Sequence, residues 1–483
     1  MLGTVPAGAQ PLVGAVAAQA STAGLGLHLI AAQNRITLPR PGGFVSLDPG
    51  IYVASLGAPL QLDVRRASYT QPITITQVLR MSSGTKSRQL PGSVLDGFNG
   101  LRRFFSMRVT NSRGKTLFAQ LMTFCPDSLD PERANQDGPQ TSPYPQQCSP
   151  MAPFPVGEVW GIAKDWAVDP TEGVTTPELA LSAGTYTVTE SIAAQYRKLF
   201  GISARAATAT VTVQVVNGNG PAVPQSLRPA GSTARPLSSA PDAPLMTDPP
   251  QSVLPEMVAL PAWQIGLSQT AANRGHSATA AIIFAATVWI GGNGPLDVQG
   301  FRANGSPTMQ AYQYFWRGGV VIGRAPVGTM GFYAQTPQSP WHFQQFAQYQ
   351  LLNADQAVAV RSRKIGFCIA PTDGIDLTLP DAVWQVSTGL AGACGSQTAL
   401  WVRETLPPGW GDTYIQALPG QSFDVTNLPN GTYYIEVIAN PEGVLYETTT
   451  AHDVSLREII LGGTPGHRTI QVPAWNGLDP GGL

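Results

Sequence analysis

The chain has 483 residues and a formal net charge of −1; 43% of its residues are hydrophobic and only 12% are charged. This near-neutral balance gives no reason to expect a nucleic acid partner or an anionic membrane surface. The 51 glycines and 43 prolines argue against long helices and favour short strands joined by turns. The body of the chain has no run of about 18 or more strongly apolar residues, so we expect no membrane span.

An uncharged lead segment occupies residues 1–27, and no Asp, Glu, Lys or Arg occurs before Arg35. Its small residues around 15–20 (AVAAQA) resemble the later part of a secretion signal, although the positive start of such a signal is missing. The alternative is a flexible apolar segment. We expect an exported protein that is secreted or extracellular.

Residues 28–216 form the first predicted domain. Its β-branched and apolar residues alternate with polar ones in short runs, and 104–124 predicts a hairpin with NSRGK as its turn. The other runs lie at 60–64, 72–80, 183–191 and 207–216. Short strands, regular turn signals and no good helix indicate an immunoglobulin-like β-sandwich.

Proline, serine and alanine dominate residues 217–257, which predicts an exposed linker. The second domain, 258–475, again consists of strand-like runs, and 476–483 is a short tail. Within this domain we interpret ATAAIIFAATVWIGG (278–292) as a buried strand pair. Both domains are therefore expected to be all-β.

The four cysteines lie as two local pairs, Cys125 with Cys148 and Cys368 with Cys394. None forms a CxxC motif, so a zinc site is a weak interpretation. Two local disulfides, one in each domain, fit the spacing and an oxidising compartment. Four reduced buried thiols are the alternative.

Three stretches of the second domain stand together: PWHFQQFAQYQLL (340–352), RSRKIGFCIAPTD (361–373), and 406–441, which contains GWGDTY. They resemble the lysyl oxidase family, in the form of secreted bacterial proteins with an added N-terminal β-domain. SPYPQQCSPMAPFPVGEVWGIAKDWAV (142–168) resembles that companion domain. The resemblance implies a lysyl-oxidase-like β-sandwich. It also implies a copper amine oxidase that converts peptidyl lysine to an aldehyde with a lysine tyrosylquinone cofactor.

The resemblance assigns roles to three residues. Lys364 and Tyr414 match the quinone precursors, and Asp412 matches the base. A lysine adds to an oxidised tyrosine ring only as the neutral amine, so Lys364 would need a lowered pKa. Asp412 and Tyr414 would share one face of a strand. The alternatives are a solvated basic turn at RSRK (361–364) and a turn at GDTY with Tyr414 packed in the core.

The copper-ligand pattern of the family is His-x-His-x-His, which places three imidazoles on one strand face. His342 matches the last histidine, but Gln338 and Pro340 occupy the other two positions. Neither side chain is a good copper ligand. The remaining histidines are scattered: His28, His276, His452 and His467. We therefore interpret His342 as a structural imidazole left from a metal site.

These observations predict an extracellular lysyl-oxidase-like protein that is catalytically silent, has no cofactor and binds protein or cell-surface polymer partners. The alternative is an active oxidase that carries copper and lysine tyrosylquinone and acts on protein lysine side chains.

Overall fold

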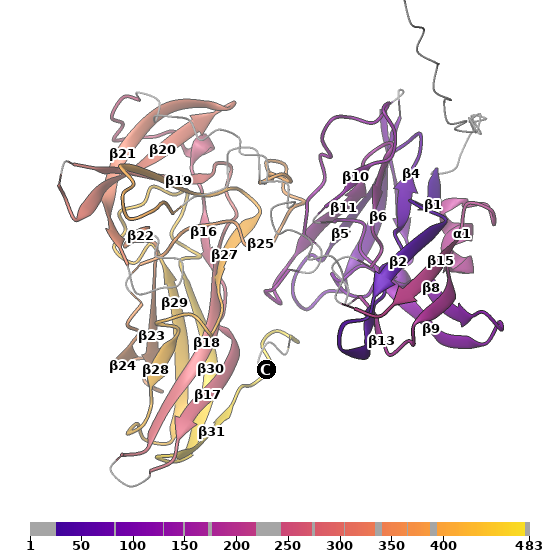
Figure 1. The fold of residues 1–483 in the computed structure, drawn as a ribbon. Helices are drawn as coiled ribbons and strands as arrows, with labels where there is room; N and C mark the ends of the chain where they lie inside the picture. Colours follow the sequence, from indigo (N-terminus) through magenta and orange to yellow (C-terminus); the bar gives the residue numbers. More distant parts are fainter. Residues whose placement is uncertain are drawn as a thin grey trace, which may run out of the picture.

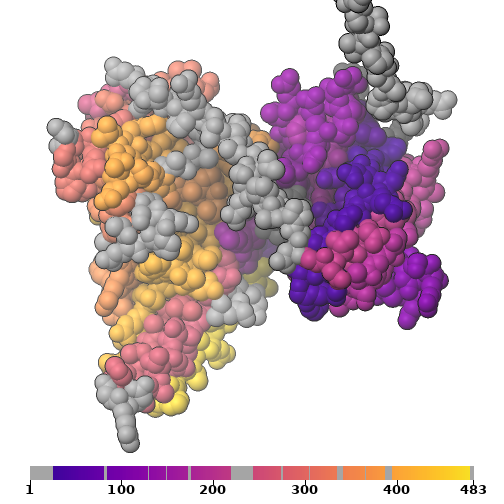
Figure 2. Space-filling model, viewed as in Figure 1, coloured from indigo at the N-terminus to yellow at the C-terminus, as the bar shows by residue number. Residues whose placement is uncertain are grey.

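The computed structural model describes residues 26–81, 84–128, 130–147, 150–171, 176–218, 243–272, 276–303, 305–333, 341–364, 366–386 and 394–478. The described fold is all-β, as the sequence predicts (Figure 1). Each of its seven sheets draws its strands either from the N-terminal part (26–218) or from the C-terminal part (243–478). The two parts are seen side by side in Figure 2.

Four sheets form the N-terminal part. The first contains β1 (Leu27–Ala31), β4 (Ile51–Ser55), β12 (Trp166–Val168) and β10 (Glu132–Arg133). The second contains β11 (Gly157–Ile162), β5 (Leu60–Arg65), β6 (Thr74–Met81) and β7 (Gly84–Leu90). The third pairs β13 (Glu178–Leu179) with β3 (Val45–Ser46). The fourth contains β2 (Arg35–Pro39), β15 (Thr208–Val216), β14 (Gly184–Ile192), β8 (Leu101–Asn111) and β9 (Thr116–Phe124).

The predicted hairpin is confirmed: β8 and β9 pair antiparallel, and Gly114 N–H closes the turn on Asn111 O at 2.9 Å. The sequence analysis missed one short helix, α1 (Ala194–Phe200). It ends at Gly201, whose φ of 69° is the left-handed conformation that glycine adopts without strain. Tyr196 and Phe200 bury one face of the helix, so tertiary packing stabilises a segment too short to be helical alone.

Three sheets form the C-terminal part. One contains β16 (Met257–Ala259), β18 (Thr279–Ile290), β27 (Trp410–Tyr414) and β25 (Asp373–Gly374), and β18 also pairs with β17 (Trp263–Thr270) and β28 (Ser422–Asp424). Another contains β22 (Trp341–Phe343), β21 (Val320–Phe332), β20 (Thr308–Arg317), β19 (Leu296–Arg302) and β26 (Trp401–Leu406). The last contains β24 (Val358–Arg361), β23 (Ala347–Leu352), β29 (Gly431–Ala439), β30 (Val454–Thr464) and β31 (His467–Gln471).

The apolar run 278–292 forms one strand, β18, and the predicted strand pair is wrong. No turn residue interrupts the run before Gly291. Four other strands pair with β18, so this strand is central to the C-terminal part and needs apolar side chains along its length.

The described end of the predicted linker packs against the C-terminal part. Leu245 forms a bridge with Arg324 of β21, and the side chains of Val253 and Leu254 are buried. The burial of Val253 and Leu254 shows that the exposed-linker prediction is wrong at the end of this stretch, whereas Leu245 is 68% exposed. Most of the predicted linker, 219–242, lies outside the described residues, as do most of the lead segment and the end of the tail.

The two parts meet through backbone hydrogen bonds. Val156 N–H donates to Ile375 O and Leu377 N–H donates to Gly157 O, both at 2.7 Å. Gly157 and Asp376 form an isolated parallel bridge. A side chain at Gly157 would collide with Asp376 and Thr378, so glycine permits this close approach. We call this contact the junction.

Candidate functional site

The candidate site combines two segments that are distant in the sequence and pack together. Lys364 lies 48 residues before Asp412 and 50 residues before Tyr414. Asp412 and Tyr414 lie on the buried strand β27. The Lys364 ammonium nitrogen lies 4.2 Å from the centre of the Tyr414 ring and 5.2 Å from that of Phe367. The structure therefore brings the predicted lysine and tyrosine into direct contact.

Lys364 is half-buried, and its RSRK segment is not a fully solvated turn. Burial lowers the pKa of Lys364 to about 8, and the charge of Asp412 acts in the opposite direction. The two aromatic faces stabilise the remaining ammonium charge through cation–π contacts. A substantial fraction of this amine is therefore neutral near physiological pH.

The phenol of Tyr414 makes two hydrogen bonds with the backbone of a single residue, Cys368. Its oxygen accepts from Cys368 N–H at 2.7 Å, and its hydroxyl donates to Cys368 O at 3.1 Å. Phe367 meets the Tyr414 ring edge-on, with centroids 5.0 Å apart. The ring is thus fixed in position, and burial raises the pKa of Tyr414 well above its usual value, as do the charges of Asp412 and Glu404.

The predicted disulfide of the C-terminal part is present between Cys368 and Cys394, whose Cα atoms are 5.6 Å apart. This bond anchors the residue that holds Tyr414. Cys125 is also disulfide-bonded, while its predicted partner, Cys148, lies outside the described residues.

Asp412 and Glu404 are buried carboxyl groups beside Tyr414. Burial raises the pKa of Asp412 well above its usual value, although the charge of Lys364 opposes that shift. Burial likewise raises the pKa of Glu404, whose Oε2 accepts from Ile369 N–H at 3.0 Å. The sequence analysis missed Glu404. A glutamate within the strand-like run WVRETL was the available signal.

His342 lies on β22 beside the segment that carries Lys364. Phe343 and Phe367 exchange backbone hydrogen bonds of 2.8 and 2.9 Å, and a side chain at Gly366 would press on His342. The Tyr333 ring packs on the imidazole with centroids 4.9 Å apart. Burial and then the charge of Lys364 lower the pKa of His342 to about 4.

The described residues around His342 supply no set of copper ligands. Among the described residues, no group of three His, Cys, Asp or Glu side chains is placed to hold a metal ion. Gln338 and Pro340 lie outside those residues, and neither is a good nitrogen or sulfur donor. Of the other histidines, His452 contacts Glu256 at 2.6 Å and His467 is on β31, which lies in a different sheet from β22.

A second group of carboxyls lies at the junction. Glu158 of β11 is buried beside Asp373 and Asp376, and these charges add to burial in raising the pKa of Glu158. Asp373 accepts from the backbone N–H groups of Met151 and Ala152. Because Asp373 also raises the pKa of Asp412, the junction and the Lys364 site are electrostatically connected.

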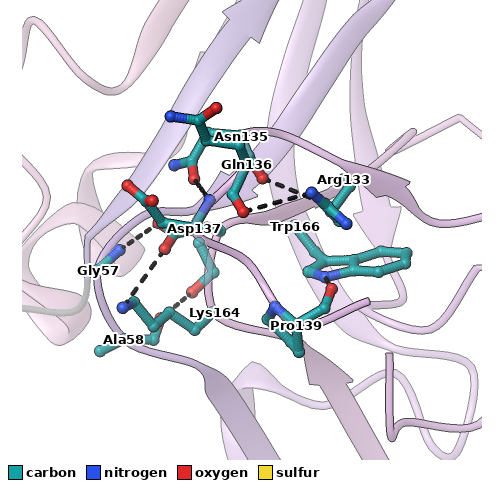
Figure 3. Close-up of polar contacts among 11 residues, drawn as sticks. Gly57, Ala58, Arg133, Asn135, Gln136, Asp137, Pro139, Lys164 and Trp166 are labelled. Atoms are coloured by element: carbon teal, nitrogen blue, oxygen red, sulfur yellow. Dashed lines mark hydrogen bonds and ion pairs between the residues drawn. The ribbon is translucent and has the colours of Figure 1, made fainter. Parts of the chain in front are cut away.

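A polar loop after β10 is a structural feature of the N-terminal part (Figure 3). Asn135 accepts from Asp137 N–H at 2.8 Å, and Trp166 Nε1 donates to Pro139 O at 2.9 Å. Asp165 binds Gly57 N–H nearby at 2.9 Å. These hydrogen bonds fix the conformation of the turn, so we assign its polar groups a structural role.

The fold and the site define a two-part all-β protein in which a half-buried lysine contacts a buried tyrosine whose hydroxyl is held by a disulfide-bonded cysteine. No model of a known protein family matches the chain, and no curated protein matches it. In the part of the chain that the structure describes, no helix is both long and apolar enough to cross a membrane.

Proposed function

We propose that this is an extracellular binding or structural protein, built from an immunoglobulin-like sandwich and a lysyl-oxidase-like sandwich, that does not oxidise amines. Its partners are proteins or a cell-surface polymer, and it uses no cofactor. The disulfides are compatible with a place outside the cell.

This proposal rests on the number of nitrogen ligands that the sequence offers to a copper ion at His342. A copper ion needs several imidazole ligands, and the sequence supplies one at that strand, with Gln338 and Pro340 at the matching positions. In the family, copper is required to oxidise the tyrosine. Without it, Lys364 and Tyr414 remain an unlinked pair held by packing and hydrogen bonds.

The test is metal and quinone content in one preparation. We expect protein refolded or expressed with excess copper to hold far less than one copper per chain after dialysis. We also expect no phenylhydrazine adduct, and intact, separate peptides for Lys364 and Tyr414. Stoichiometric copper together with a hydrazine adduct would disprove the proposal.

An active amine oxidase is the second candidate, and the 4.2 Å contact between Lys364 and the Tyr414 ring favours it. Those two residues would form the quinone, and Asp412 would take up a substrate proton. This candidate predicts hydrogen peroxide release from lysine-rich protein, which is abolished in Lys364→Arg and retained in the exposed-site control Lys198→Arg.

A further inference from the structure

Lys364 differs from every other lysine of the chain. The sequence has five lysines, and four of them are exposed: Lys86, Lys115, Lys164 and Lys198. Lys364 is half-buried, and its nitrogen lies over the Tyr414 and Phe367 rings. The molecule therefore contains one unusual amine and four ordinary ones for comparison.

The Lys364 amine has no close ionic partner among the described residues. The ion pairs within 4.0 Å in that part of the chain include Lys164 with Asp165, at 3.6 Å, but none that involves Lys364. Ring faces stabilise an ammonium group less than a hydrogen-bonded carboxylate does. Lys364 therefore gives up its proton more readily than a paired or solvated lysine, in agreement with its lowered pKa.

We propose that Lys364 is a reactive amine that condenses with small neutral aldehydes. This inference rests on the proposed function, because it requires an amine that is not joined to Tyr414. The apolar faces of Phe367 and Tyr414 favour an uncharged aliphatic aldehyde. The buried groups Asp412 and Glu404 are acidic and offer no cationic partner for an aldehyde that carries a carboxylate, so the burial of such an anion is disfavoured.

The step is an ordinary imine formation. The lone pair of the neutral Lys364 nitrogen forms a bond to the aldehyde carbon, and the carbonyl oxygen takes a proton. The resulting carbinolamine loses its hydroxyl, with a second proton, as water, and a C=N bond forms. Solvent supplies the proton for the dehydration, because Asp412, whose pKa burial raises well above its usual value, interacts with this amine only electrostatically.

The experiment traps the imine in the full-length protein. Native protein at pH 7.5 is treated briefly with propionaldehyde and cyanoborohydride, which reduces the imine to a stable propyl amine, and each lysine is quantified by peptide mapping. We expect Lys364 to react at least tenfold faster than the mean of the four exposed lysines, because burial lowers the pKa of Lys364 to about 8. Its rate should level off above pH 8, where most of the Lys364 amine is neutral.

Glyoxylate, an aldehyde that carries a carboxylate, is tested in parallel. With glyoxylate we expect a smaller ratio between the reaction rate of Lys364 and that of the exposed lysines. Lys364→Arg should remove the fast phase, and the matched control Lys198→Arg should keep it. A Lys364 that is unlinked but reacts no faster than the exposed lysines, or follows their pH profile, overturns this inference alone. A Lys364 peptide already joined to the Tyr414 peptide before treatment overturns both this inference and the proposed function.

Discussion

The hydroxyl of Tyr414 makes two hydrogen bonds with the backbone of Cys368, accepting from its N–H at 2.7 Å and donating to its carbonyl at 3.1 Å. The disulfide to Cys394 holds that same residue through its side chain. The position of the buried phenol, and with it the surface on which Lys364 rests, therefore depends on a covalent link made 26 residues along the chain.

Removal of this disulfide should destabilise the C-terminal part. Closing a loop with a sequence separation of 26 residues restricts the unfolded chain, so we expect the double change Cys368→Ser and Cys394→Ser to lower the free energy of unfolding by about 3 kcal/mol. Denaturant unfolding monitored by tryptophan fluorescence measures this. The exposed change Ser396→Ala should have almost no effect. Unchanged stability in the double variant would show that the bond does not constrain the fold.

His342 should make the protein sensitive to acid. Its pKa falls from 6.5 unfolded to about 4 folded, so the unfolded state takes up a proton first as the pH decreases. The stability that the neutral imidazole contributes is present above pH 6.5 and is lost towards pH 4, by up to about 3 kcal/mol. We expect Tm to fall less between pH 6.5 and 4 in His342→Gln than in the wild type, and the exposed His467→Gln to match the wild type. Equal slopes for the wild type and His342→Gln would contradict this.

Much of this architecture could be predicted from sequence because strands leave a local signature. The alternation in 104–124 and the NSRGK turn specify the β8–β9 hairpin, since each residue's face follows from its position. The sequence predicts two strands at 278–292 where the structure has one, because a central strand needs apolar residues on both faces, which removes alternation. The helix α1 was missed because seven residues carry little periodicity, and its stability comes from the burial of Tyr196 and Phe200.

The site was predictable only in part. Lys364, Asp412 and Tyr414 were selected through a family resemblance, and nothing local in the sequence places Lys364 against the Tyr414 ring. That contact depends on how the segment after β24 packs on β27. Glu404 was missed for a similar reason: a glutamate in a strand is usually exposed, and its burial follows from long-range packing around Ile369.

The junction should weaken as the pH rises. Burial and the charges of Asp373 and Asp376 hold the folded pKa of Glu158 well above its unfolded value. The folded state therefore keeps the proton that the unfolded state releases, and stability is greatest below about pH 4.5 and declines above it. Arg65 lies 3.8 Å from Asp376 but is largely exposed, so it compensates little.

The Glu158→Gln variant tests the predicted direction in which stability changes with pH. We expect its Tm to fall less than that of the wild type between pH 5 and pH 8, because the neutral amide has no proton to lose. The exposed Glu442→Gln should behave as the wild type does. A Glu158→Gln variant whose Tm falls as steeply as the wild type's would show that this carboxyl is ionised in the folded protein at little cost.

Gly157→Ala should separate the two parts. The added Cβ would lie 2.2 Å from Asp376 Oδ1 and 2.4 Å from Thr378 Oγ1, so these side chains have to move and the contacts of the junction are weakened. We expect calorimetry to show two resolved transitions in place of a more cooperative one, with each part still folded by circular dichroism. In Gly92→Ala the nearest atom is 3.8 Å away, and its thermogram should match the wild type. A single unchanged transition in Gly157→Ala would mean that the junction contributes no cooperativity.

Asp412→Asn separates the effect of burial from that of charge at Lys364. Burial lowers the pKa of the amine to about 8, while the carboxylate form of Asp412 raises it, so removal of that charge should lower the pKa of Lys364 further. The midpoint of Lys364 acetylation against pH, followed by peptide mapping, should therefore move below pH 8. The exposed change Asp381→Asn should leave every midpoint in place. An unmoved Lys364 midpoint in Asp412→Asn would show that Asp412 is fully protonated beside the amine, since a neutral acid replaced by a neutral amide changes no charge.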